Sequence, residues 1–381
     1  MLDIAGAVEA EWPDEGVAAH YGDPMREQRV MSEQARYPRL PSGLPSGSAG
    51  GPLPGGSQGV LVDRANRGVI KITGTDRLSW LHSLTSQHLE RLTPGTTAQA
   101  LVLDPQGRLE HHLTLTDDGA ATWLHVEPHT APALVGYLNS MRFMLRVEVE
   151  DLSGVLGVAT IAHSPGGNSG KSVEGTDPAD CPPSTLSEAV GAEAVMQGPF
   201  CIDLIVGPDA TGKLATAFPV AGMWAFEAAR IAAHVPRPGL DTDHKTVPHE
   251  VGLIETAVHL NKGCYRGQET VARIHNVGRP PRRLVFLHLD GSVDRLPAHG
   301  SPLTLADGTE VGTVGSAARH YELGPIGLGL IKRTVPVDAP LLADGVAAAQ
   351  EVIVSPDAGG NVKVTLRRDA VPQPPAGRRM L

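Results

Sequence analysis

Short runs of alternating hydrophobic and polar residues predict β-strands in the first half of the chain. Residues 68–74 alternate in this way, and residues 98–128 contain three further runs separated by turns rich in Asp and Gly. Between these segments, Leu78, Leu81 and Leu84 recur at helical spacing. The pattern predicts a strand, a helix and an antiparallel meander that together form a mixed α/β unit.

The second half of the chain changes from helical spacing to short β-like runs. Residues 222–236 are rich in Ala and end at a proline, and they predict a helix. The apolar face expected to lie in the core consists of Trp224, Ala228, Ile231 and Val235. From about residue 282 to 368, short alternating runs are separated by Gly and Pro, which is typical of an antiparallel barrel or sandwich. The fold class is therefore α+β, with two mixed α/β units followed by an all-β unit.

Two segments poor in hydrophobic residues divide these units. Residues 38–59 are rich in Pro, Gly and Ser, and residues 163–186 are polar and turn-forming. Neither segment has enough apolar surface to offset the entropy cost of ordering, so we predict two flexible loops. The remaining domains are an N-terminal helical segment (1–37), a first α/β domain (60–162), a second α/β domain (187–281), a C-terminal barrel (282–370) and a tail (371–381).

The charge and hydropathy of the chain exclude several classes of partner. Asp and Glu outnumber Lys and Arg by 42 to 32, which gives a net charge of -10, so no direct nucleic-acid binding is expected. The chain has no run of about 18 apolar residues, and no membrane partner is expected. The acidic N-terminus lacks the basic and apolar regions of a signal peptide, which favours a cytoplasmic location.

The three cysteines do not form a self-contained disulfide or zinc pattern. Their number is odd and no Cys-x-x-Cys pair is present. Cys181 lies in a polar segment and is interpreted as a bystander. Cys201 lies between Phe200 and Ile202, which predicts a buried and inert thiol.

Cys264 has the features of a reactive thiol. Glycines flank it, and residues 267–276 predict a short helix directly after it. The amides at a helix N-terminus, together with the cations of Lys262 and Arg266, favour the thiolate form. A packed thiol on a tight turn is the alternative. A single thiolate can attack, be oxidised or donate one metal ligand, but it cannot hold an iron-sulfur cluster alone.

The segment around Cys264 resembles a family signature. Residues 262–269 match the K-G-C-Y-x-G-Q-E motif of the folate-binding YgfZ family, relatives of the glycine-cleavage aminomethyltransferase that include the mitochondrial iron-sulfur assembly factor. The motif residues are Lys262, Gly263, Cys264, Tyr265, Arg266, Gly267, Gln268 and Glu269, and Arg273 and His275 follow on the predicted helix. The resemblance extends over residues 68–86, 105–109, 141–153, 229–243, 248–253, 312–317 and 326–333.

The resemblance implies a fold and a function. The fold is two α/β domains and a β-barrel around a channel that takes tetrahydrofolate, with residues 1–37 packed on the folate-binding domain. The function is support of iron-sulfur cluster assembly or repair, with client enzymes or assembly machinery as partners and folate as the small-molecule ligand. Cys264 is the working residue, and Lys262 assists it.

The resemblance also identifies a candidate folate site that departs from the family pattern. The relatives carry a pterin-anchoring Glu after an Arg-Ile or Arg-Leu pair, but here Ala232 follows that pair, so weaker folate binding is expected. Aromatic stacking is left to Phe226 or to Trp224, and a carboxylate contact to Glu227. With Arg230, the candidate cofactor-binding residues are Trp224, Phe226, Glu227 and Arg230.

Histidines replace acids at three further positions. The relatives carry a paired Asp where this chain has His111 and His112, and often an Asp where it has His88. Neighbouring residues of a strand point to opposite faces, so no metal site is expected from the His pair. A tetrahydrofolate-dependent one-carbon (aminomethyl) transferase and a non-catalytic folate-binding scaffold remain alternatives, although an ordinary aminomethyltransferase is not expected.

The sequence leaves several properties open. These are whether the protein is an enzyme, which client enzyme and folate form it uses, its oligomeric state, and whether Cys264 acts as cluster ligand, nucleophile or redox thiol.

Overall fold

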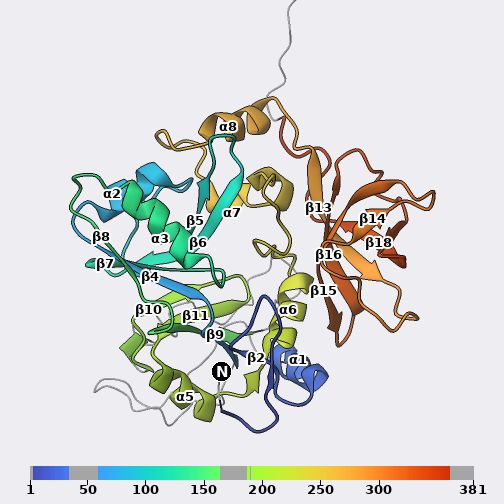
Figure 1. The fold of residues 1–381 in the computed structure, drawn as a ribbon, viewed down its shortest axis with the longest axis horizontal. Helices are drawn as coiled ribbons and strands as arrows, with labels where there is room; N and C mark the ends of the chain where they lie inside the picture. The colour runs from blue at the N-terminus through green and yellow to red at the C-terminus, as the bar shows by residue number, and fades with distance from the viewer. Residues whose placement is uncertain (1–2, 34–58, 164–186, 189, 361–381) are drawn as a thin grey trace, which may run out of the picture.

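The protein contains two five-stranded sheets and a closed six-stranded barrel. The structure is a computed structural model that describes residues 3–33, 59–163, 187–188 and 190–360. Figure 1 shows the barrel on one side and the two sheets on the other, with short helices between them. The α+β fold class predicted from the sequence is confirmed. No helix within the described ranges is long and apolar enough to cross a membrane.

The first sheet is a continuous part of the chain. Its spatial order is β5-β6-β7-β4-β8. Its elements are β4 (Gly68–Thr73), α2 (Arg77–Leu84), β5 (Thr97–Leu103), β6 (Leu109–Asp117), β7 (Ala121–Val126), α3 (Ala131–Ser140) and β8 (Glu148–Asp151). Leu81 and Leu84 of α2 and Leu134 of α3 are buried against Ile70 and Ile72 of β4. The predicted strand, helix and meander are therefore confirmed.

The second sheet draws its strands from both sides of the first sheet. Its spatial order is β10-β11-β9-β3-β12. Its elements are β3 (Val60–Arg64), β9 (Gly157–Ala162), β10 (Ala194–Gln197), β11 (Cys201–Val206), α5 (Pro208–Ala217), β12 (Val220–Ala221) and α6 (Met223–Ala232). The predicted first α/β domain, residues 60–162, therefore does not coincide with one sheet. Its strands β3 and β9 pair with each other and with later strands. Alternation of polarity indicates which face a strand buries, but not which strand lies beside it.

The N-terminal segment packs on the second sheet. It contains β1 (Val8–Glu9), β2 (Ala18–His20) and α1 (Pro24–Ser32). The Asp23 side chain accepts from the amides of Met25 and Arg26 and caps α1. Met31 of α1 is buried in one cluster with Met223 and Phe226 of α6. The segments predicted to be flexible, 38–59 and 163–186, lie outside the described residues except at their ends, as does the predicted tail.

The C-terminal unit is the predicted antiparallel barrel. Its strands are β13 (Arg282–Leu289), β14 (Pro302–Thr304), β15 (Glu310–His320), β16 (Gly324–Lys332), β17 (Leu341–Ala343) and β18 (Val346–Val352). The ring closes where β18 pairs with β13. Three short helices connect the second sheet to the barrel: the 3-10 helix η2 (Pro248–Val251) and the α-helices α7 (Ile254–Ala257) and α8 (Gln268–Asn276). They border the site described below.

Candidate functional site

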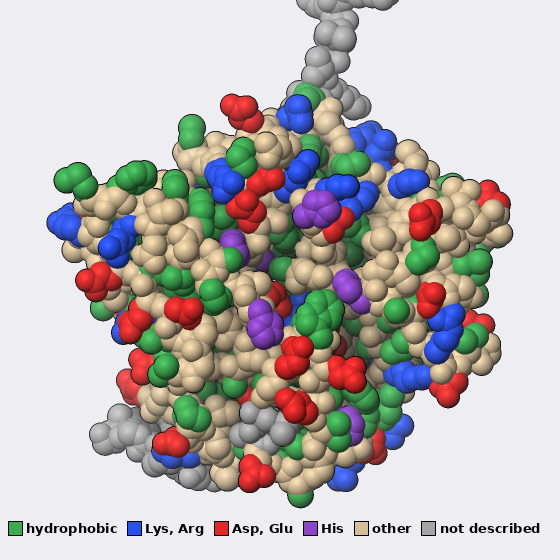
Figure 2. All heavy atoms as spheres, viewed as in Figure 1, with side chains coloured by type: hydrophobic (Ala, Val, Ile, Leu, Met, Phe, Trp, Pro, Cys, Tyr) green, Lys and Arg blue, Asp and Glu red, His purple; other side chains and the backbone are tan. Residues whose placement is uncertain are grey.

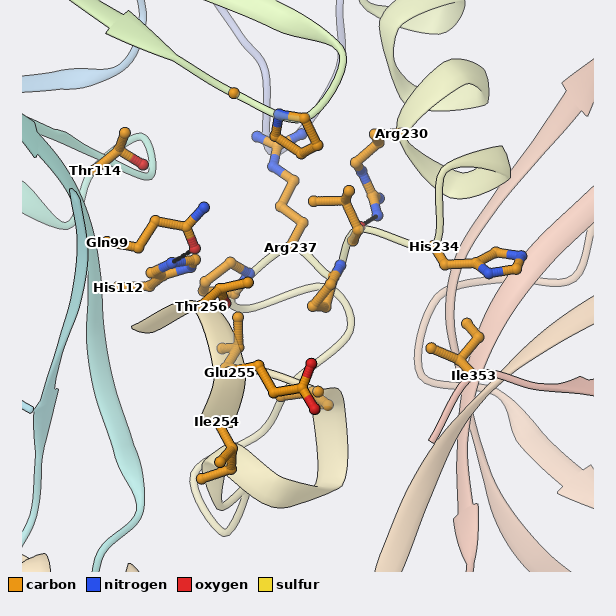
Figure 3. Close-up of a pocket in the computed structure, with 18 of the residues that line it drawn as sticks. Gln99, His112, Thr114, Arg230, His234, Arg237, Ile254, Glu255, Thr256 and Ile353 are labelled. Carbon is orange, nitrogen blue, oxygen red and sulfur yellow. Dashed lines mark hydrogen bonds between the residues drawn. The ribbon is translucent and has the colours of Figure 1, made fainter. Parts of the chain in front are cut away.

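A cavity of about 720 Å³ lies where the three units meet. One wall comes from β5 and β6 of the first sheet, another from α6 and the loop after it, and others from α7 and the end of the barrel (Figure 3). Figure 2 shows several histidines around the hollowed middle of this face. A volume of this size can hold a drug-sized ligand. A cavity is therefore present where the resemblance implies a channel between the three units.

Buried Arg237 joins the N-terminal segment, the first sheet and α6 beside the cavity. Arg237 contacts Asp14 of the N-terminal segment at 2.7 Å, Glu127 of the first sheet at 2.7 Å and Glu227 of α6 at 3.2 Å. Burial alone would raise the pKa of Glu127, but the neighbouring arginines hold that pKa well below its ordinary value. Glu127 therefore stays ionised, and its oxygens are occupied by cations.

A second chain of polar contacts fixes His125. Arg67 Nε donates to His125 Nδ1 at 2.9 Å, and His125 Nε2 lies 3.1 Å from Asp203 Oδ2. Burial lowers the pKa of His125 to about 4. The ring is thus neutral at pH 7 with its proton on Nε2, because Nδ1 is the acceptor. Asp203 also pairs with Arg64 at 3.1 Å.

The candidate folate residues on α6 that border the cavity already have partners. Arg230 lines the cavity, with its guanidinium paired to Glu227 and, at 2.7 Å, to Asp241. Phe226 also lines it, but the Arg64 guanidinium lies 4.4 Å from the centroid of its ring. Glu227 is not part of the cavity lining; it is partly buried, and its carboxylate accepts from Arg230 and Arg237. A new ligand would have to displace these partners to bind Phe226 or Glu227.

Trp224 and Ala232 lie outside the lining of the cavity. Trp224 is 54% exposed and its ring lies 4.9 Å from that of His20, so the prediction that it lies in the core is wrong. The helix presents this side chain to β2 and to solvent. Ala232 borders a smaller hollow between α1, α6 and the turn from β15 to β16. The position expected to hold a pterin-anchoring Glu therefore does not face the central cavity, and α6 does not fit that anchoring role.

The two adjacent histidines separate as expected for a strand. His112 lines the cavity with Thr114, and its Nε2 lies 3.0 Å from Gln99 Oε1. Leu113 and Leu115, which alternate with them, lie in the core of the first sheet. His111 is not part of the cavity lining. Among the described residues, no group of three His, Cys, Asp or Glu residues is arranged to hold a metal ion.

His249 is a cavity residue that the sequence analysis did not identify. It is 5% exposed, and neither ring nitrogen has a hydrogen-bond partner among the described residues. A buried polar group left without a partner costs about 1–3 kcal/mol. The centroid of the His275 ring, from α8, lies 6.1 Å from that of the His249 ring. The indication that the sequence offered was its position in 248–253, one of the segments that resemble the family.

Cys264 lies in an exposed loop ahead of α8, and the nearby cations contact other groups. Cys264 is exposed. Lys262 Nζ donates to the carbonyl oxygens of Thr85 at 2.5 Å, of Gln87 at 3.0 Å and of His82. These contacts use the three N–H groups of the ammonium, while burial lowers the pKa of Lys262 to about 8. Arg266 pairs with Glu110 at 2.9 Å. Both cations thus fix the loop to the first sheet.

The other motif residues shape this loop. Tyr265 is 8% exposed and packs in the core next to α8, and Gln268 Nε2 donates to the carbonyl of Lys262 at 3.3 Å. Gly267 has a φ of 82°, and a Cβ there would lie 2.5 Å from the carbonyl oxygen of Asp104. Gly263, Glu269 and Arg273 are exposed. Gly267 is therefore required for α8 to approach the turn between β5 and β6.

Cys201 differs from Cys264 in its surroundings. It is 6% exposed, which confirms the prediction of a buried thiol. Burial raises the pKa of the Cys201 thiol well above its ordinary value, and the carboxylate of Asp203 acts in the same direction. Of the two cysteines within the described ranges, Cys264 is the accessible one.

Comparisons with known proteins agree with this architecture. Residues 282–368 match the family model of the CAF17 C-terminal beta-barrel domain. The chain is 28% identical over 301 residues to "Putative transferase At1g60990, chloroplastic" of Arabidopsis thaliana, covering 72% of this chain and 65% of that protein. It is 26% identical over 242 residues to the mitochondrial "Iron-sulfur cluster assembly factor IBA57 homolog" of Mycosarcoma maydis, covering 60% of this chain and 56% of that protein. The matches thus span less than two thirds of either relative.

A solved structure shares the fold. The glycine cleavage system aminomethyltransferase T from Bartonella henselae superposes with a TM-score of 0.68 at 14% identity, covering 91% of this chain and 93% of that one. Together these findings confirm the resemblance to YgfZ- and IBA57-like proteins and show that the chain has the fold of aminomethyltransferase T.

Proposed function

We propose that this chain, similar to YgfZ- and IBA57-like proteins, supports the assembly or repair of iron-sulfur clusters in client enzymes through Cys264. The observation that carries the proposal is the exposed thiol in a loop that matches the family signature. The similarity to the IBA57 homolog of Mycosarcoma maydis supports the same role. The cluster is cargo here, because one thiolate cannot hold it alone.

The other motif residues act by positioning Cys264. Lys262 ties the loop to carbonyls at the end of α2, and Tyr265 anchors it in the core. Cys264 lies between these two anchored residues and faces solvent. A thiolate held in this way can donate one ligand to a cluster while the assembly machinery or client enzyme supplies the remaining ligands, or it can attack a partner's disulfide and release the second sulfur as thiolate.

We further propose that the central cavity takes a reduced folate. Its volume and mixed lining support a ligand of this size. The carboxylates Glu127, Asp203 and Glu227 already pair with arginines, so they are poor anchors for a pterin. We therefore expect weaker folate binding than in relatives that carry a free carboxylate on the helix corresponding to α6.

Complementation tests the role of Cys264. In a strain that lacks the protein, wild-type chain should restore the activity of cluster-containing enzymes, whereas Cys264→Ser should not. Cys201→Ala is the control for loss of a thiol as such and should restore activity. Protein levels are measured by immunoblot in each strain. Full restoration by Cys264→Ser at equal protein level would contradict the proposal.

A further inference from the structure

His249 combines burial with unused hydrogen-bonding capacity. Its side chain lines the central cavity, is 5% exposed, and has no hydrogen-bond partner at either nitrogen among the described residues. The carboxylates of Glu127 and Asp203, which line the same cavity, are already paired with arginines. A polar group that enters the cavity therefore meets a free acceptor and a free donor at His249 without displacing an ion pair.

The backbone around His249 is fixed by its neighbours. The carboxylate of Glu250 accepts from the amide of Val247 at 3.1 Å and from Arg282 Nε at 2.9 Å. Glu250 is fully buried, and Arg282 extends from the first strand of the barrel. Because η2 is held in this way, the imidazole needs little reorganisation when a ligand binds.

The protonation state of His249 restricts the ligand chemistry. Burial and the neighbouring His275 lower the pKa of His249 to about 4. At pH 7 the ring is therefore neutral, with one N–H donor and one nitrogen acceptor. A neutral ring of this kind can donate to the carbonyl of an amide-like edge or accept from its N–H, with one nitrogen making the contact. The nearby side chains of Val251, Ile254 and Ile353 give apolar contact for a flat ring.

We propose that His249 hydrogen-bonds the heterocycle of the cavity ligand, and that this heterocycle is a flat ring with an amide edge, such as the pteridine of a reduced folate. The inference rests on the proposed folate ligand. It places the ring contact on η2, next to the barrel, instead of on α6, where Glu227 is paired and Ala232 faces another hollow. His249 thus supplies the polar contact that α6 does not.

Calorimetric titration with 5-formyltetrahydrofolate tests the proposal. The wild type should bind, His249→Leu should bind at least tenfold more weakly, and His249→Gln, which keeps a donor and an acceptor, should stay within about threefold of the wild type. His288→Leu removes a half-exposed histidine on the outside of the barrel and should bind as the wild type does. Equal binding by the wild type and His249→Leu would overturn the inference, and so would a His249→Gln variant as weak as His249→Leu.

Two further results distinguish a failure of the inference about His249 from a failure of the folate proposal. Without ligand, His249→Leu should unfold at a temperature equal to or higher than the wild type, because Leu has a similar volume and leaves no unpartnered nitrogen. A lower unfolding temperature would show that His249 has a structural partner and would overturn the inference. No binding by the wild type would overturn both this inference and the folate ligand, whereas the complementation test of Cys264 is independent of either.

Discussion

The loop around Cys264 and the central cavity use charged residues in different ways. In the loop, the side chains of Arg266 and Glu110 are 34% and 37% exposed, so their pairing is screened by water. Beside the cavity, the side chains of Arg237 and Asp14 are 7% and 8% exposed and join distant parts of the chain. The loop therefore presents chemistry to a partner at little cost in stability, while the cavity depends on the integrity of its ion pairs.

The two cysteines give the largest expected contrast between these regions. Cys264 should react with iodoacetamide at least about a hundredfold faster than Cys201, because the Cys201 thiol is 6% exposed and its raised pKa keeps it from forming the reactive thiolate. Mass spectrometry of the folded protein over time measures both rates. Equal rates, or faster labelling of Cys201, would show that the second sheet opens readily and that the contrast between exposed loop and buried cavity is wrong.

Arg237→Ala tests the buried network. Three carboxylates contact this guanidinium, so its removal leaves buried charge uncompensated and should lower the free energy of unfolding by about 3–5 kcal/mol. The matched control is Arg266→Ala, whose exposed pair should contribute less than about 1 kcal/mol. Urea denaturation measures both. Equal losses in the two variants would contradict the distinction between the regions.

The pH dependence of stability follows from the buried histidines. The pKa of His125 is lowered from 6.5 to about 4 in the folded protein, so the unfolded chain binds more protons between these values. Its contribution to stability is complete above pH 6.5 and is lost as the pH falls towards 4. The loss from pH 7 to 5 should be about 2 kcal/mol for this group, and His249, whose pKa is lowered in the same way, adds to the total loss. Urea denaturation at pH 7, 6 and 5 measures it, and a stability that rises with acid would refute the assignment.

Gly267→Ala should lower global stability less than Arg237→Ala does, and its effect should be the most local one. The left-handed conformation costs an alanine about 1–2 kcal/mol, and its Cβ would also meet the Asp104 carbonyl. The strain falls on the loop, so amide hydrogen exchange in 262–269 should rise while the second sheet keeps its protection. The control is Gly136→Ala in α3, where the added Cβ meets open space, and this variant should leave the exchange unchanged.

The sequence predicted features that depend on local pattern. The meander, the barrel, the helix after Cys264 and the burial of Cys201 each follow from periodicity or from immediate neighbours. It did not predict that β3 and β9 join the second sheet, since strand partners are set by packing between distant segments. It also placed Trp224 in the core, because helical spacing marks a face without showing where that face ends at solvent.

The candidate site was predicted only in part for the same reason. The motif identified Cys264, but the contacts of Lys262 with carbonyls about 180 residues away carry no sequence signal. Arg237 and Asp14, which are 223 residues apart, pair without any periodic pattern. His249 is distinguished by what it lacks among the described residues, a hydrogen-bond partner, and this property exists only in three dimensions.

The interleaved strands of the two sheets have a consequence for synthesis of the protein. All strands of the first sheet lie between residues 68 and 151, so this sheet can form as soon as that stretch has left the ribosome. β3 emerges earlier, but its partners β9 and β12 end at residues 162 and 221. Until those residues are made, β3 has unpaired edges that can associate with other nascent chains. The N-terminal strand of the second sheet thus needs protection during translation until its partners are made.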